Sequence, residues 1–300
     1  MERWHRSVLL DETLELLGEI KGGMFADLTF GEGGHTEAIL EKGAKQVFAV
    51  DRDSEAINRY LKDGRLKDDP RLKIFHGNLS SFPEMGFEEP FDGILMDLGV
   101  STRQLLEADR GFSFTESGPL DMRMNRSEGP TLEELLSQIK APDLADIIYE
   151  NTDLRTSRPV ARRILYAFEK GELKTTADLA KLFHSPRPQD KNPATVIFLA
   201  LRMWVNQEGN EVRDTIPQLI PLLKKGGRLA VITFHSSEDR WVKNLFQRLS
   251  GQCVCGKSPC ECPRVEIVKL VTRKPVGPSD KEKSENARSR SALLRCVERL

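Results

Sequence analysis

The stretch MFADLTFGEGGH, residues 24–35, decides the fold of this chain. It begins with an apolar run that predicts a buried β-strand and ends in a cluster of glycines, and a helical pattern follows at residues 36–41. Because glycine has no Cβ, such a turn lets the backbone approach a ligand closely and leaves amide groups pointing at it. The strand, the turn and the helix together predict a nucleotide-type binding loop.

The neighbouring patterns extend this unit into a sheet. Further apolar runs predict buried strands at residues 46–50, 72–75 and 91–98. Runs of this length, separated by helical patterns such as residues 56–61, indicate parallel βαβ units. Asp51 follows the strand at 46–50 and lies 20 residues after Gly31. In βαβ nucleotide-binding folds, an acid at that spacing contacts the ribose hydroxyls.

The middle of the chain has a different pattern. From about residue 105 to 208 the signals are helical, with capping boxes that begin at Thr131 and Thr175. A fifth strand is predicted at residues 226–234, before a helix capped by Ser236 or Ser237.

Two late apolar runs, residues 265–271 and 292–297, suit an antiparallel pair of strands. The polar segment 278–291 between them predicts a mobile loop. We therefore expect an α/β fold in which residues 1–105 and 208–300 form a doubly wound domain. An all-helical subdomain, residues 106–207, is then inserted between its fourth and fifth strands.

The chemistry of the glycine loop separates two cofactor classes. A nicotinamide enzyme would prefer G-x-G-x-x-G, because a pyrophosphate must lie on the helix N-terminus. Glu32 within GEGGH would repel that pyrophosphate, whereas S-adenosylmethionine has no phosphate and carries a cationic sulfonium. Asp27 and Asp97 near such a ligand are favourable. Residue chemistry thus favours a methyltransferase, with a nicotinamide-dependent oxidoreductase as the alternative.

Charge is unevenly distributed along the chain, although its formal net value is -1. Residues 1–154 carry a net charge of -14 and residues 155–300 one of +13. Residues 155–191 hold nine bases and four acids, and Arg158, Arg162 and Arg163 share roughly one side of a predicted helix. Contact with RNA phosphates and a merely solvated helix face are equally compatible with this pattern.

No apolar window is long enough for a membrane span, and the N-terminus lacks a signal-peptide pattern. We expect a cytoplasmic protein with reduced thiols and no membrane partner. Four cysteines lie within ten residues, at Cys253, Cys255, Cys260 and Cys262. They could hold a tetrahedral Zn²⁺, although C-x-C pairs are less usual than C-x-x-C. Cys296 is expected to be a buried strand residue.

Several ungapped motifs resemble one family closely. The motifs are FGEGGH (30–35), DRD (51–53), DLGVS (97–101), RGFSF (110–114), GPLDMR (118–123), LRMWVN (201–206), FHSSEDR (234–240) and NARSR (286–290). Together with flanking matches they run from residue 5 to 299. The chain resembles the bacterial family of 16S ribosomal RNA cytidine N(4)-methyltransferases.

The resemblance implies a class I (Rossmann-like) methyltransferase sheet with an inserted helical subdomain for RNA recognition. It implies S-adenosylmethionine as cofactor and 16S rRNA, within the small ribosomal subunit, as substrate. It requires no metal, and we assign none to the site. The implied cofactor contacts are Gly33, Gly34, His35, Asp51, Leu79, Asp97 and Gln104. Leu79 stands where the family commonly has an aromatic residue.

Methylation of a cytosine amine needs a group that holds an amine hydrogen and fixes the attack angle. Asp97 is the candidate, and His235 is a second candidate that could equally cap a helix. Phe112 and Phe114 could stack on an extruded base or belong to the core of the subdomain. An RNA-binding module that has lost catalysis is a third hypothesis. The intact glycine loop and Asp97 argue against it. The sequence leaves a homodimer open.

Overall fold

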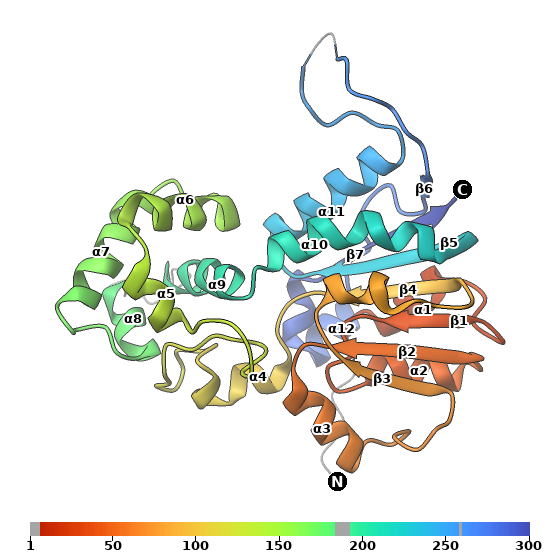
Figure 1. Ribbon diagram of the computed structural model, residues 1–300, viewed down its shortest axis with the longest axis horizontal. Helices are drawn as coiled ribbons and strands as arrows, with labels where there is room; N and C mark the ends of the chain where they lie inside the picture. Colours follow the sequence, from red (N-terminus) through yellow and green to blue (C-terminus); the bar gives the residue numbers. More distant parts are fainter. Residues whose placement is uncertain (1–6, 184–192, 258–259) are drawn as a thin grey trace. The chain divides into compact units, whose positions relative to one another are not determined.

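The computed structural model describes residues 7–183, 193–257 and 260–300. They divide into two compact units, Met1–Gly99 with Asn210–Leu300, and Val100–Gly209. Figure 1 colours the second unit from yellow to green and the first in the remaining colours. Among the described residues, no helix is both long enough and apolar enough to cross a bilayer.

The first unit is built on a seven-stranded sheet in the order β3-β2-β1-β4-β5-β7-β6. The strands are β1 (Met24–Asp27), β2 (Gln46–Asp51), β3 (Leu72–His76), β4 (Phe91–Asp97), β5 (Leu223–Thr233), β6 (Val268–Leu270) and β7 (Leu293–Arg299). Strands β1 to β5 are parallel, and β7 is antiparallel to both β5 and β6. The expected class I sheet with a late antiparallel pair is confirmed.

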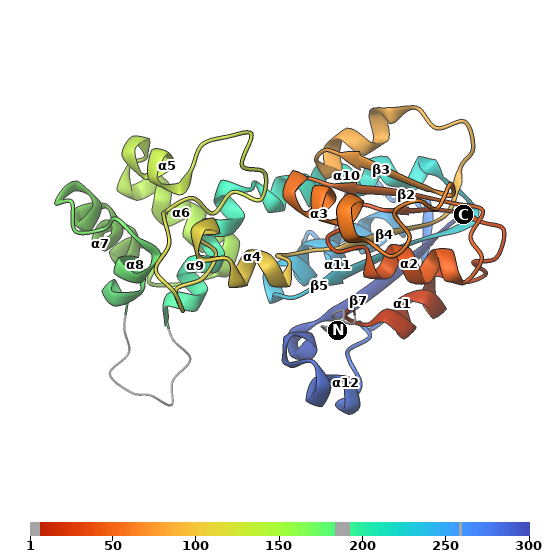
Figure 2. The same ribbon diagram turned by 90° about the horizontal axis from the view of Figure 1, so that it is seen from below.

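Helices cover both faces of this sheet (Figures 1 and 2). They are α1 (Leu10–Leu17), α2 (Gly34–Glu41), α3 (Ser54–Asp63), α10 (Glu208–Leu219) and α11 (Ser236–Leu249), whereas α12 (Asp280–Glu285) has no buried residue. On β4, Ile94 and Met96 pack with α10 and α11, whereas Leu95 packs with α1, α2 and α3. Both faces of the central strands are therefore buried, which explains their continuous apolar runs.

Short 3₁₀ turns connect several elements of the chain. They are η1 (Leu79–Met85), η2 (Ala108–Arg110), η3 (Ile220–Leu222) and η4 (Ala287–Ser291). Gly93 on β4 shows how closely the layers pack. A Cβ at this position would lie 2.7 Å from the Phe25 ring and 2.9 Å from a Leu17 methyl group.

The second unit is helical, and its described part contains no β-strand. Its helices are α4 (Thr102–Leu106), α5 (Leu132–Gln138), α6 (Ala141–Thr152), α7 (Ser157–Glu169), α8 (Thr176–Leu182) and α9 (Pro193–Val205). They surround one apolar core that includes Leu144, Ile164 and Leu201. The capping boxes predicted at Thr131 and Thr175 are confirmed, with Glu134 and Asp178 as their third helical residues.

Two local predictions are wrong. The N-cap of α11 is His235, with Glu238 closing the capping box, rather than Ser236 or Ser237. The segment 278–291 is not an irregular loop, because it forms α12 and η4. Its polar side chains make local caps: Ser279 accepts from the Glu282 amide at 3.1 Å, and Asn286 accepts from the Arg288 amide at 3.2 Å. The polar residues that predicted a loop thus act as N-caps of two short helices.

Asn206, in the LRMWVN motif, holds together the irregular chain that precedes α5. Its Oδ1 accepts from the Met124 amide at 2.7 Å, and its Nδ2 donates to the Met122 carbonyl at 2.7 Å and the Arg202 carbonyl at 2.9 Å. Met122 adopts a positive φ of 61°. The buried Arg110 donates to the Met124 carbonyl at 2.9 Å from the other side.

We expect Asn206→Ala to destabilise the second unit by about 3 kcal/mol, because it orphans a buried amide and a buried carbonyl. Urea unfolding followed by fluorescence and circular dichroism measures the loss. Asn210→Ala, at an exposed position four residues away, is the matched control and should change the free energy of unfolding by less than about 0.5 kcal/mol. Equal effects of the two variants would contradict this role.

Candidate functional site

The glycine loop joins β1 to α2, as the sequence predicts. Gly31 and Gly33 have positive φ values of 54° and 80°, and α2 begins at Gly34. A Cβ on Gly33 would lie 2.5 Å from the Tyr60 ring, and one on Gly34 would collide with the Ser7 hydroxyl. Among the described residues, the sole atom within 4 Å of a Cβ added to Gly31 is the Thr29 carbonyl oxygen, at 3.9 Å. Gly33 and Gly34 are thus required by packing within the protein, and Gly31 faces the more open side.

Three carboxylates lie at the carboxyl ends of adjacent parallel strands. Asp27 ends β1, Asp51 ends β2 and Asp97 ends β4. The order of the sheet reverses between β1 and β4, and ligands of open α/β sheets bind outside the carboxyl ends of strands at such a switch point. The strand order alone therefore brings Asp27 and Asp97 to this place.

Asp27 is buried, and its carboxylate fastens β1 to α2. Thr36 donates its hydroxyl to Oδ2 at 2.7 Å, and the Thr29 amide donates to Oδ1 at 3.2 Å. Burial raises the pKa of Asp27, although His35 and these two threonines act to lower it. We singled out Asp27 only as an acid near the ligand, and neither threonine. The buried hydroxyl of Thr36, nine residues after Asp27, carried no sequence signal of its own.

Asp51 fastens the glycine loop to β2. Its Oδ2 accepts from the Gly31 amide at 2.6 Å, and its Oδ1 accepts from the Asp53 amide at 2.8 Å. Burial raises the pKa of Asp51 to about 6. Each oxygen retains a second lone pair, so the carboxylate can also accept hydrogen bonds from a ligand.

Asp97 and His35 have side-chain atoms whose hydrogen-bonding capacity is not used. The Asp97 amide donates to the Thr29 hydroxyl at 2.6 Å, which fixes its backbone. Its Oδ2 lies 3.6 Å from Nε2 of His35. Among the described residues, the buried Oδ1 of Asp97 and both ring nitrogens of His35 have no hydrogen-bond partner. Such groups are costly unless a ligand or water satisfies them.

The charge of this cluster suits a cationic ligand. Burial by itself would lower the pKa of His35, but Asp97 and then Asp27 outweigh it, and the net shift is upward. The cluster thus combines three acidic groups with one basic group, an excess of acidic groups. A sulfonium and an amino-acid ammonium group would offset that excess, and ribose hydroxyls could donate to Asp51. The residues present therefore fit S-adenosylmethionine.

Two other predicted residues of the first unit have clear packing or capping contacts. Leu79 begins η1 and packs against the core below β2 and β4. His235 caps α11, and the buried Glu238 accepts from the amides of Phe234 at 2.9 Å and His235 at 3.1 Å. The capping role of His235 is established by this geometry, and its catalytic role stays a prediction.

The remaining predicted residues lie in the second unit. Gln104 is buried in α4, where its side chain accepts from the Ser101 amide at 3.0 Å. Phe112 is only 7% exposed, and Phe114 packs edge-on against Phe198 at a centroid distance of 4.9 Å. These contacts favour the core role of both rings. Base stacking, like a cofactor contact of Gln104, stays a prediction.

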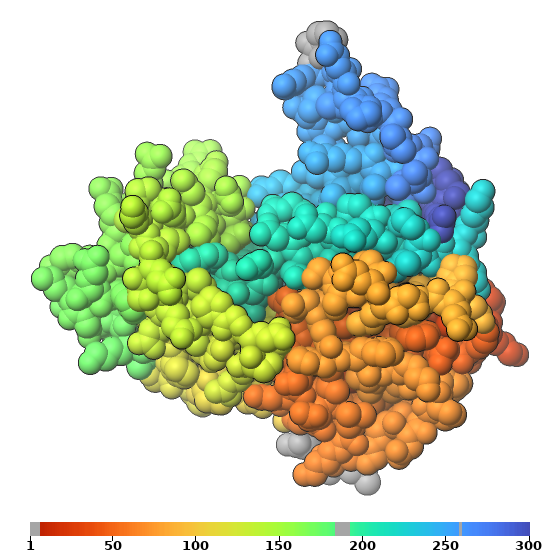
Figure 3. All heavy atoms as spheres, viewed as in Figure 1, coloured from red at the N-terminus to blue at the C-terminus, as the bar shows by residue number. Residues whose placement is uncertain are grey.

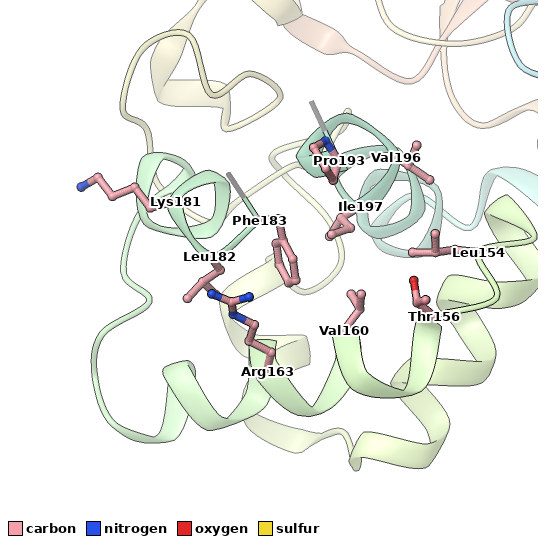
Figure 4. A pocket seen from close by; sticks show the side chains of 10 residues that line it. All are labelled: Leu154, Thr156, Val160, Arg163, Lys181, Leu182, Phe183, Pro193, Val196 and Ile197. Carbon is pink, nitrogen blue, oxygen red and sulfur yellow. The ribbon is translucent and has the colours of Figure 1, made fainter. Parts of the chain in front are cut away.

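The side chains of Arg158, Arg162 and Arg163 are exposed on α7. The guanidinium of Arg163 lies 5.6 Å from the centre of the Phe183 ring, at a cavity of about 350 Å³ between α7, α8 and α9. Figure 4 shows apolar side chains facing this cavity and Lys181 pointing away from them. Arg187 and Lys191 of the predicted basic segment lie outside the described residues.

Comparison with known proteins agrees with this geometry. The profile of the MraW methylase family matches residues 2–300. Ribosomal RNA small subunit methyltransferase H of Acinetobacter baumannii (strain AB0057) is 41% identical over an aligned length of 305 positions, which covers 99% of this chain and 98% of that protein. Its namesake from Hydrogenovibrio crunogenus is 42% identical over 306 residues, covering 99% and 96% of the two chains.

Among solved structures, an rRNA methylase from Streptococcus thermophilus covers 99% of both chains, at 12% identity and a TM-score of 0.45. The family assignment follows from the sequence matches, which span almost every residue at about two identities in five. The chain belongs to the MraW methylase family.

Proposed function

We propose that this protein transfers a methyl group from S-adenosylmethionine to the exocyclic amine of a cytidine in the decoding region of 16S rRNA. As a member of its family it is a methyltransferase that uses S-adenosylmethionine, which disfavours the nicotinamide-dependent alternative and the module without catalysis. The name shared by its relatives supports rRNA of the small subunit as substrate. The motif resemblance supports the cytidine amine.

The observation that carries the proposal is the position of Asp97. It lies at the carboxyl end of β4, beside the switch point, and its Oδ1 is buried without a partner among the described residues. A carboxylate left with unused acceptor capacity at this place suits a donor that arrives with the substrate. The cytosine amine is such a donor.

In the reaction, the bound cofactor supplies a methyl carbon activated by its bond to a sulfonium. The amine nitrogen would attack this carbon in line: the N–C bond would form as the C–S bond breaks, S-adenosylhomocysteine would leave as a neutral thioether, and the amine would release one proton to solvent. Asp97 accepts one amine hydrogen, which directs the nitrogen lone pair toward the methyl group. His35, 3.6 Å from Oδ2, holds the Asp97 carboxylate in place. Asp51 and the loop around Gly31 hold the cofactor.

RNA recognition is proposed for the second unit, residues 106–207 in our sequence-based assignment. The exposed arginines of α7 are suited to phosphate contacts, which fix the position of an RNA without reading its sequence. We further propose that the substrate is the rRNA within the small ribosomal subunit, and hence that the protein works in the cytoplasm.

The first test is methyl transfer from labelled S-adenosylmethionine to purified small subunits that lack the modification, followed by nucleoside analysis. The wild type should produce N(4)-methylcytidine. Asp97→Ala should lower kcat by about 10²–10³-fold, because a single preorganised hydrogen bond in a reaction site contributes on that order. Asp63→Asn, at an exposed position on α3, should retain full rate. A different methylated nucleoside would overturn the substrate assignment, and full activity of Asp97→Ala would overturn the mechanism.

The second test concerns Asp51 and pH. Since the pKa of Asp51 is raised to about 6, its carboxylate is ionised at neutral pH and loses acceptor strength below that value. The Kd of S-adenosylhomocysteine, measured by calorimetry, should rise as the pH falls through 6. In Asp51→Asn the affinity should be about 10–100-fold lower at neutral pH, the value of one or two charge-assisted hydrogen bonds, and it should lose this pH dependence.

Protonation of Asp51 does not itself destabilise the free protein. The folded pKa of Asp51 lies above its ordinary value of 3.8, so its contribution to stability is fully present below 3.8 and is lost as the pH rises through about 6. Lowering the pH from 6 toward 4 therefore stabilises the free protein at this group while it weakens the complex. A wild-type Kd that stays constant across this range would argue against Asp51 as a ribose ligand.

The third test concerns the basic helix. Replacing Arg158, Arg162 and Arg163 together by glutamine should reduce the slope of log Kobs against log salt for RNA binding by about 2, since each phosphate contact contributes 0.7–0.9. Binding of S-adenosylhomocysteine should not change. The matched control replaces three exposed lysines of the first unit, Lys62, Lys67 and Lys73, by glutamine. An unchanged slope in the arginine variant would show that α7 is only a solvated surface.

A further inference from the structure

Four thiols gather at a place remote in sequence from every residue of the proposed site. The Sγ atoms of Cys253, Cys255, Cys260 and Cys262 all lie within 4.8 Å of one another. Cys253 Sγ lies 3.0 Å from Cys255 Sγ and 3.0 Å from Cys260 Sγ, and the latter two are 3.5 Å apart. None of the four forms a disulfide.

The segment that carries them has no apolar core. It leaves the first unit after α11, where Ser250 pairs with Glu266 and the Ile267 amide donates to the Leu249 carbonyl at 2.9 Å. It projects from the surface as a loop (Figures 1 and 3). None of its described residues between 251 and 267 is buried. Hydrophobic burial therefore cannot hold four sulfurs together here, and a segment of this kind needs a metal or cross-links.

The separations fit four ligands around one ion. With Zn–S bonds of about 2.3 Å, the sulfurs of a regular tetrahedron lie about 3.8 Å apart. Three of the observed separations are 3.0, 3.0 and 3.5 Å, and all lie within 4.8 Å, so the four sulfurs are close enough together to surround one ion.

Backbone amides already point at the sulfurs. The Cys255 amide donates to Cys253 Sγ at 3.3 Å, the Lys257 amide to Cys255 Sγ at 3.4 Å, and the Cys262 amide to Cys260 Sγ at 3.3 Å. Hydrogen bonds of this kind orient metal ligands and offset the negative charge of bound thiolates. In all three cases the amide belongs to the residue two positions after the cysteine.

We propose that Cys253, Cys255, Cys260 and Cys262 bind one structural Zn²⁺. Four sulfur ligands in a tetrahedron are typical of zinc or iron, and a set this compact surrounds a single ion rather than a multi-iron cluster. On binding, the four thiols release four protons and the site becomes a tetrathiolate complex of charge -2. No coordination position stays open, so the ion has a structural role. The ion would stabilise the loop in place of an apolar core, above the pairing of Ser250 with Glu266 at its base.

The experiment is a metal analysis of the full-length protein purified without chelators. Mass spectrometry of the metals should find about one zinc per chain, as a closed site requires. The double variant Cys253→Ser with Cys262→Ser should contain less than about a tenth of that, because two ligands cannot retain the ion. Cys296→Ala is the matched control, since Cys296 is buried in β7 outside the cluster, and it should keep its zinc.

Two further measurements keep the test decisive. Cobalt reconstitution of the wild type should give the intense visible bands of a tetrahedral thiolate complex, and the double variant should not. Removal of zinc should open the loop to trypsin at Lys257 and Arg264. Unchanged binding of S-adenosylhomocysteine by the double variant would show that the sheet is folded, which separates this proposal from the proposed function. A protein with intact thiols but no zinc, with iron instead, or with zinc retained by the double variant would overturn it.

Discussion

The buried carboxylate of Asp27 is the interaction on which the site depends. It accepts from Thr36 on α2 and from Thr29 after β1, and the Thr29 hydroxyl in turn accepts from the amide of Asp97 at the end of β4. One charged group thus sets the relative positions of two strands and a helix. Burial raises its pKa, which means that ionising this group inside the protein costs free energy. The hydrogen bonds from Thr36 and Thr29 offset part of that cost.

The same cluster explains why a cationic ligand fits where a phosphate would not. Asp51 and Asp97 are acidic groups like Asp27, and His35 is the basic side chain beside them, with a pKa that Asp97 and Asp27 raise. A ligand that brings positive charge and hydroxyl donors lowers the electrostatic energy of all three carboxylates at once. In a nucleotide-binding sheet of this kind, the sign of the residues at the strand ends selects the cofactor, while the glycine turn only makes room for it.

Features set by a local stretch of sequence were predicted, and features set by contacts between distant segments were not. The buried strands, the glycine loop and Asp51 were predicted because apolar runs and glycine spacing are local signals, whereas the class I arrangement of the strands was implied by the family resemblance. The helix α12 was missed because its stability comes from Ser279 and from a contact between Glu282 and the distant Leu9 amide, at 2.9 Å. The threonines that bind Asp27 were missed for the same reason. Their partners are defined only once β1, β4 and α2 are in place.

The opposite charges of the two halves of the sequence do not coincide with the two structural units, because residues 1–99 carry a net charge of -8 and residues 210–300 one of +8, and both belong to the sheet unit. Carboxylates needed to hold a cationic cofactor would repel an RNA backbone, since like charges at short range in a site of low dielectric interact strongly. Exposed arginines needed for phosphate contacts would in turn weaken the cofactor site if they lay within it. In the proposed function the two kinds of charge are separated locally: Asp27, Asp51 and Asp97 gather at the strand ends, and the arginines lie exposed on α7. Each unit by itself is close to neutral, so the small net charge says nothing against a nucleic-acid substrate.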